Sequence, residues 1–171
     1  MPSTSGQEDD AVNRRPARRF RAGAALRFVL AADWISPSVA RSRFRDWLGA
    51  RRWPEDEVDD LVLAVSEAVS NSIEHGYGVP VDSALLPHPG QIEVTAAVKQ
   101  SAVGARHIEL TIRDAGTWRE PGPGPVPRGF GLDLMRAAGL YFVVERSTEG
   151  TRIRFTSRPV ADIATSPPDK Q

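Results

Sequence analysis

The sequence predicts an α+β fold, a two-layer sandwich in which a mostly antiparallel sheet carries its helices on one face. Segments with the alternating pattern of strands are joined by short turns, as in antiparallel hairpins. The first two helical segments follow one another with no strand between them, unlike the alternating strand–helix units of a parallel sheet. At 171 residues the chain can bury a full core as one domain.

The first strand and the first two helices are indicated by apolar spacing and by their starting residues. An apolar run of strand length begins at Leu26. Ser36 and Pro37, an N-cap residue followed by proline at the first helical position, open an amphipathic helix. A second helix opens at Pro54, where three acids suit the helix dipole, and stops at Gly76. The expected elements are therefore strand 26–31, helix 37–51 and helix 54–75.

After Gly76, a loop rich in glycine and proline extends to residue 90. Two segments of alternating apolar and polar residues then predict a pair of strands connected as a hairpin through residues 99–106. A second Gly- and Pro-rich segment, 115–128, excludes a regular element, and a short helix and a last hairpin follow it. The expected elements are therefore strands 91–98 and 107–113, helix 130–139, and strands 141–147 and 151–156.

The two ends of the chain are polar and poor in large apolar residues. Residues 1–23 are expected to form a disordered arm and residues 158–171 a disordered tail, which leaves a domain over 24–157. The arm is rich in arginine, as nucleic-acid-binding arms are, but such a charge run is more often a solvated tail.

Composition narrows the classes of function. Acidic and basic residues balance at 22 each, so no overall field directs the protein to nucleic acid or to a membrane. No apolar run approaches the roughly 20 residues of a membrane span, and the N-terminus lacks the core of a secretory signal. The absence of cysteine excludes disulfides, thiolate zinc sites and a catalytic thiol. We therefore expect a cytoplasmic protein with no membrane or direct nucleic-acid partner.

Glu67, Asn71 and His75 recur at four-residue intervals, which places them on one stripe of the second helix. The same spacing is found on ordinary solvated helix faces. Asparagine is, however, a poor residue inside a helix, and its amide oxygen suits Mg²⁺, which takes phosphates and waters as its other ligands. A carboxylate one turn earlier can act as a general base.

Two further segments have the composition of nucleotide contacts. Asp114 ends a predicted strand, where its carboxylate can accept a hydrogen bond from the amine of adenine. Gly116 has no side chain and lets the base approach the backbone closely. The glycine loop 122–132 leads into a predicted helix, whose free N–H groups favour phosphate. The alternatives are a plain turn and a flexible surface loop. Trp118 is expected to report on nucleotide or to cover the base, whereas Trp34, Trp47 and Trp53 are expected to be core or staple residues.

Several other sites are excluded by spacing. The glycine loop is not followed by the lysine of a P-loop, and Leu132 breaks the dinucleotide-binding fingerprint. The three histidines lack metal-ligand spacing, and no G-x-S-x-G nucleophile motif is present.

In their chain order, four segments resemble the ATP-site motifs of the Bergerat-fold superfamily, which includes gyrase, heat-shock chaperones, histidine kinases and MutL. The four are Glu67–Tyr77, with the form E-x-x-x-N-x-x-x-H-x-Y, Asp114–Gly116, Arg128–Leu132 and Glu149–Thr151. The form of the first segment is most similar to the anti-sigma-factor serine kinase family. The resemblance covers residues 24–157.

The resemblance implies ATP and Mg²⁺ as cofactors and a role for each matching residue. Asn71 would hold the metal ion, Glu67 would take the proton of a serine hydroxyl on a partner, and His75 would lie near the phosphates. Asp114 would read adenine, with Gly116 and Thr151 beside it. The phosphate cradle would consist of Arg128, Gly129, Phe130, Gly131 and Leu132.

The same resemblance implies a serine/threonine-protein kinase acting on an anti-anti-sigma-factor-like partner, serving as an anti-sigma factor that binds a sigma factor, and forming a homodimer. The alternative is a non-catalytic ATP-binding module that sequesters a protein partner. A histidine kinase fragment would have a helical segment with a phosphorylatable histidine upstream of the domain, and residues 1–25 contain no histidine.

Overall fold

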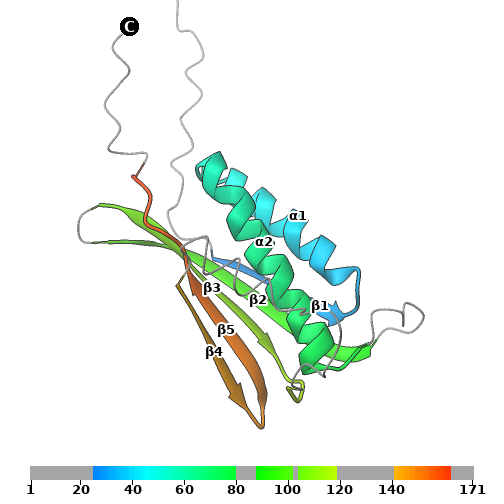
Figure 1. Cartoon of the computed structure of the whole chain (residues 1–171). Coiled ribbons are helices and arrows are strands. Elements are labelled where there is room, and N and C mark those ends of the chain that lie inside the picture. Colours follow the sequence, from blue (N-terminus) through cyan, green and yellow to red (C-terminus); the bar gives the residue numbers. More distant parts are fainter. Residues whose placement is uncertain (1–24, 80–87, 102–103, 119–140, 163–171) are drawn as a thin grey trace, which may run out of the picture.

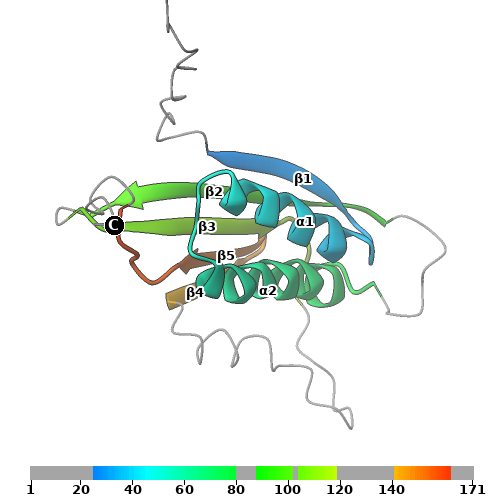
Figure 2. The same cartoon turned by 90° about the horizontal axis from the view of Figure 1, so that it is seen from above.

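The structure is a computed structural model, and it describes residues 25–79, 88–101, 104–118 and 141–162. A five-stranded sheet has the order β1-β2-β3-β5-β4, and every neighbouring pair is antiparallel. Two helices lie side by side on one face of it (Figures 1 and 2). The predicted two-layer α+β architecture is confirmed. The elements are β1 Leu26–Ala32, α1 Ser36–Gly49, α2 Glu55–Asn71, η1 Ser72–Gly76, β2 His88–Gln100, β3 Arg106–Asp114, β4 Tyr141–Ser147 and β5 Gly150–Thr156.

The core lies between the helices and the sheet. The predicted apolar stripe of α2 is buried throughout, and the inward residues of the strands pack against it in one cluster. Along β3 buried and more exposed residues alternate, so each strand presents one face to the helices. Burying one Val, Leu or Ile side chain stabilises a fold by about 1.5–3 kcal/mol. The stripe consists of Val58, Leu61, Val62, Val65, Val69 and Ile73.

Several boundaries differ from the prediction, among them the start of β2, which lies at His88 rather than at residue 91. Ser36 is not the N-cap: Ile35 holds that position, and the Ser36 hydroxyl donates to the Ala31 carbonyl at 2.7 Å, which fixes the strand-to-helix turn. The first helix ends at Gly49, two residues before the expected end. Pairing of β2 with β3 continues to Gln100 and Arg106, so residues 99, 100 and 106 of the expected hairpin connection 99–106 are strand.

The predicted helix 130–139, the N-terminal arm 1–23 and most of the 76–90 loop lie outside the described residues. The expected tail 158–171 is described as far as residue 162. Its first residues remain on the domain, because Val160 pairs with Arg106 through backbone hydrogen bonds of 2.9 and 2.8 Å. The expected domain boundary at 157 therefore falls inside a region of contact.

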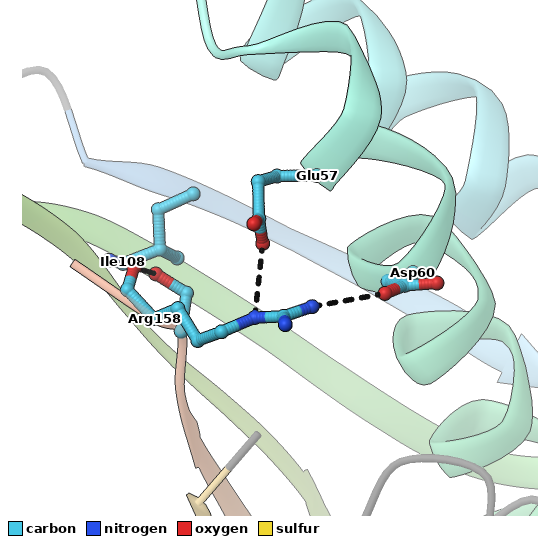
Figure 3. A network of polar contacts seen from close by, with 5 residues as sticks. Glu57, Asp60, Ile108 and Arg158 are labelled. Carbon is cyan, nitrogen blue, oxygen red and sulfur yellow. Dashed lines mark hydrogen bonds and ion pairs between the residues drawn. The ribbon is translucent and has the colours of Figure 1, made fainter. Parts of the chain in front are cut away.

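The segment after β5 ties the sheet to α2 by an ion-pair network (Figure 3). The Arg158 guanidinium lies 3.5 Å from the Glu57 carboxylate and 3.3 Å from that of Asp60. Beside it, the Ser157 hydroxyl accepts the Ile108 N–H at 2.9 Å. Exposed ion pairs stabilise by about 0–1 kcal/mol each, so this network orients the segment more than it stabilises the fold.

A buried arginine joins the turn between the helices to the start of β3. The Arg106 guanidinium donates to the carbonyls of Arg51 and Arg52 at 2.8 and 2.7 Å and lies over the Trp53 ring. These carbonyls follow the C-terminal end of α1, where backbone acceptors lack partners within the helix. Burial lowers the pKa of Arg106. Trp53 and Trp47 are core residues, as expected.

Candidate functional site

Helix α2 changes its hydrogen bonding where the motif residues lie. After Asn71 the chain continues as the π-helical turn η1, in which the Tyr77 N–H donates to the Ser72 carbonyl five residues earlier at 3.0 Å. Such turns recur at functional sites. Glu67 and Asn71 lie half-buried on α2, whereas His75 lies on η1 and is only 7% exposed.

Glu67 and Asn71 lie one helical turn apart on the same face of α2. Neither side chain forms a hydrogen bond or ion pair with another residue in the part of the chain that the structure describes. A carboxylate and an amide in this state can accept an incoming proton or coordinate a cation. Over the same residues there is no group of three or more acidic or histidine side chains that would form an all-protein metal cage.

Asp114 ends β3 with its carboxyl group directed to the helix layer. The side chain is 2% exposed, and Oδ1 accepts the Gly116 N–H at 3.0 Å. Burial raises the pKa of Asp114, while Ser72 and the backbone N–H groups of Gly116 and Thr151 act in the opposite direction. A buried acceptor of this kind is suited to bind one specific donor of a ligand.

Two hydroxyls beside this carboxyl lack full partners. The Oγ1 atom of Thr151, which pairs with Asp114 across the sheet, is buried without a hydrogen bond among the described residues. The Ser72 hydroxyl is close enough to Asp114 to favour its ionised form, but its geometry is not that of a complete hydrogen bond. Unpaired buried groups in a native fold indicate a missing water or ligand. An acceptor flanked by two hydroxyls fits the amine and ring nitrogens of a purine.

Three glycines allow the backbone to close around Asp114. A Cβ atom on Gly76 would lie 2.9 Å from Asp114 Oδ1, and one on Gly116 would lie 2.2 Å from the Gly76 carbonyl oxygen. Gly150 has a φ of +124°, and a Cβ there would lie 1.9 Å from the Asp114 carbonyl oxygen. The structure thus gives Gly116 a packing role against η1, beside the predicted approach of a base.

Tyr77 is a site residue whose role sequence reasoning missed. Its hydroxyl donates to the Gln91 carbonyl at 2.7 Å and accepts the N–H groups of Gln91 and Ala115, both at 3.1 Å. Its ring lies against Gly90, where a Cβ would come within 2.5 Å. Tyr77 therefore links the end of η1 to β2 and to the segment after Asp114. Its place at the end of the first motif was the available signal.

We expect Tyr77→Phe to weaken nucleotide binding about threefold to tenfold, since the loss of one hydrogen-bonding hydroxyl costs about 0.5–1.5 kcal/mol. The hydroxyl orders the Ala115 backbone next to Asp114 rather than contacting a ligand. Isothermal titration calorimetry with ATP measures the effect, and Tyr141→Phe, at a 71% exposed position, is the matched control. An affinity equal to that of wild type would contradict this positioning role.

His75, Trp118 and Arg146 form a stack beside Asp114. The ring centroids of His75 and Trp118 are 5.1 Å apart with an interplanar angle of 38°, and the Arg146 guanidinium carbon lies 4.1 Å from the centre of the Trp118 ring. His75 comes from η1, whereas Arg146 comes from β4. The indole is therefore in contact with side chains from both layers of the domain.

The structure brings together part of the predicted site. Glu67, Asn71 and His75 lie on α2 and η1, and Asp114, Gly116 and Thr151 lie beneath the end of η1. The predicted phosphate cradle lies outside the described residues, which leaves those five positions as predictions. They are Arg128, Gly129, Phe130, Gly131 and Leu132.

Comparison with known proteins agrees with this geometry. The family described as "Histidine kinase-like ATPase domain" matches residues 30–157. Among solved structures, the chain is similar to the RsbU and RsbW domains of Rv1364c from Mycobacterium tuberculosis, with 22% identity and a TM-score of 0.54 over 79% of this chain and 32% of that one. That likeness supports the fold. In the described residues no helix is long and apolar enough to cross a membrane.

Two matches come from the blue-light activated histidine kinase EL346 of Erythrobacter litoralis. One has 20% identity over 61% of this chain and 31% of that one, and the other, its histidine kinase domain, has 14% identity over 71% and 60%. Both have a TM-score of 0.38. The chain spans about a third of the length of the Mycobacterium protein and of the longer Erythrobacter chain.

Proposed function

The chain belongs to the histidine kinase-like ATPase domain family, and from this premise we propose that it binds ATP with Mg²⁺ between η1 and the ends of β3 and β5. The observation that carries the proposal is the buried Asp114 carboxyl with the unpaired hydroxyls of Ser72 and Thr151 beside it. Asp114 accepts a hydrogen bond from the exocyclic amine of adenine, and the two hydroxyls bind the edge of the adenine ring directly or through water.

Asn71 holds the metal ion in this proposal. Asn71 would hold Mg²⁺ through its amide oxygen, and the ion would supply positive charge against the charge that develops on the phosphates during transfer. One protein amide is enough for such a site, because phosphates and waters supply the remaining ligands. The half-buried position of Asn71 on α2, without another partner among the described residues, supports this role.

We further propose that the protein is a serine/threonine-protein kinase, with Glu67 as the general base. Its carboxylate takes the proton of a serine or threonine hydroxyl on a protein substrate, the oxygen attacks the γ-phosphorus, and ADP leaves. The carboxylate of Glu67, one turn from Asn71 and without a hydrogen-bond or ion-pair partner among the described residues, supports this assignment. The proposed partners are an anti-anti-sigma-factor-like protein as the substrate, a sigma factor that this chain binds as an anti-sigma factor, and a second copy of this chain.

The test is calorimetric titration with ATP in Mg²⁺ and in EDTA. We expect Asn71→Ala to lower the affinity at least about tenfold in Mg²⁺ and to leave the affinity in EDTA unchanged, because only the metal-linked contact is lost. Alanine is the better helix former, so the variant should remain folded. Leu63→Ala, at an exposed position of the same helix, is the matched control.

Absence of ATP binding by folded wild-type protein would refute the proposed function. An equal loss of affinity with and without Mg²⁺ would remove Asn71 from the metal site but leave ATP binding in place.

A further inference from the structure

The indole of Trp118 bridges the two layers of the domain. It contacts the His75 ring of η1 in the helix layer and lies against the Arg146 guanidinium of β4 in the sheet. Ring–ring and cation–ring contacts are both attractive in these arrangements. Together, His75 and Arg146 form a slot that accepts a flat aromatic ring.

This slot adjoins the carboxyl that we propose to read the base. On the helix side, His75 precedes Gly76, where a Cβ would lie 2.9 Å from Asp114 Oδ1. On the sheet side, Asp114 pairs with Thr151 and Thr151 pairs with Arg146, so the three residues form one row across β3, β5 and β4. Neighbouring strands are about 4.8 Å apart, so the row is only about 10 Å long.

The row and the slot are closed in this structure. Asp114 is 2% exposed and Thr151 is 1% exposed, so a base reaches the Asp114 carboxyl only if a neighbouring group moves. The Nε1 donor of Trp118 is buried without a hydrogen-bond partner among the described residues. Because no hydrogen bond to Nε1 stabilises this position of the indole, a ligand that forms hydrogen bonds at the same place can displace it.

We propose that Trp118 determines nucleotide affinity by occupying the slot between His75 and Arg146, and that the purine base of the nucleotide displaces the indole from it. The inference rests on the proposed function. Indole and purine are both fused two-ring systems, so one slot suits either. Protein molecules with the indole in the slot cannot bind nucleotide. The apparent affinity for nucleotide is therefore the intrinsic affinity multiplied by the fraction of molecules in which the slot is open.

Calorimetric titration of ATP into Trp118→Ala, Trp118→Phe and wild type tests the proposal. We expect Trp118→Ala to bind about tenfold more tightly, because the competing ring is gone. Trp118→Phe, with a smaller ring, should fall between the two. Trp53→Phe, under Arg106 at the opposite end of β3, should bind as wild type does. Weaker binding by both Trp118 variants would overturn displacement and make Trp118 a wall of the site.

Fluorescence supplies a second readout. The difference between wild type and Trp118→Phe isolates the Trp118 signal from that of the other tryptophans. ATP is expected to shift this signal to the red and to increase its quenching by acrylamide, since the indole leaves its slot. An ATP-saturated protein with no change in the signal would refute the inference while leaving the proposed function standing. If no variant binds ATP, the proposed function fails, and displacement by nucleotide fails with it.

Discussion

Replacing Asp114 by Asn is expected to lower ATP affinity about a hundredfold, the largest effect on binding that we predict for this protein. Both oxygens of the carboxylate can accept a hydrogen bond from the amine of adenine. An asparagine that keeps its oxygen on the Gly116 N–H would instead present its NH₂ group to that amine, and two donors cannot pair. The group is buried, so water cannot substitute for the lost contact.

Folding should be affected far less than binding. Burial raises the pKa of Asp114, which means that its charge is unfavourable in the folded protein at neutral pH. Asparagine removes this unfavourable charge but loses one acceptor for the backbone N–H groups around it. Because these effects oppose each other, the free energy of unfolding at pH 7 should stay within about 1 kcal/mol of wild type.

The pH dependence follows from the same shift. Between the ordinary pKa of 3.8 and the raised pKa, the folded state binds more protons at Asp114 than the unfolded state does. The contribution of Asp114 to stability therefore falls as pH rises through this window and stays low at neutral pH. Relative to Asp114→Asn, wild type should gain stability as pH falls through the window toward 3.8.

Calorimetry and urea unfolding at several pH values measure both effects. Asp59→Asn is the matched control, because Asp59 is an exposed acid on α2 with a side chain 81% exposed. Undiminished ATP binding by Asp114→Asn would move base recognition elsewhere. Global unfolding of the variant would show that the carboxyl is required for the fold itself; Asp114→Ser, a smaller side chain with an acceptor, would then test binding.

Glu67→Gln is expected to lower the rate of phosphate transfer by about a hundredfold to ten-thousandfold while leaving ATP affinity near that of wild type. Glutamine has nearly the same shape but cannot take a proton from the attacking hydroxyl. Since Glu67 has no hydrogen-bond or ion-pair partner among the described residues, the change should not alter stability by more than about 0.5 kcal/mol.

Transfer is measured with radiolabelled ATP and an anti-anti-sigma-factor-like protein as substrate. The matched control is Glu55→Gln, an exposed acid in the first turn of the same helix. Equal transfer by wild type and Glu67→Gln would remove Glu67 as the base. Tight ATP binding with no transfer by wild type to any such substrate would favour the alternative, a non-catalytic module that sequesters its partner.

The sequence predicted the elements whose signals are local. The apolar stripe of α2 and the alternation along β3 depend only on neighbouring residues, and both correspond to observed elements. Ser36 was wrongly assigned as the N-cap, because its hydroxyl donates to the Ala31 carbonyl in the preceding strand rather than capping the helix. The ends of β2 were missed because the pairing of Gln100 with Arg106 depends on the partner strand.

The site divides in the same way. Asn71 could be singled out because asparagine is a poor residue inside a helix, and Glu67 because it lies one helical turn before Asn71. Asp114 could be singled out because it ends a predicted strand and is followed by Gly116. Neither the hydroxyl of Tyr77 nor the stack around Trp118 could be predicted, since their partners lie on other elements. The spacing rule assumed an α-helix at His75, where the chain instead forms a π-helical turn.

The π-helical turn η1 also limits which insertions and deletions the segment 72–76 can accept. A π-helical turn accommodates one residue more than the α-helical turn it replaces, so η1 is equivalent to a single-residue insertion that has been retained within a helix. A deletion there would restore regular winding, rotate Gly76 away from Asp114 and place a side-chain-bearing position against the carboxyl. Related sequences that keep this site should therefore hardly vary at all in the length of the segment 72–76.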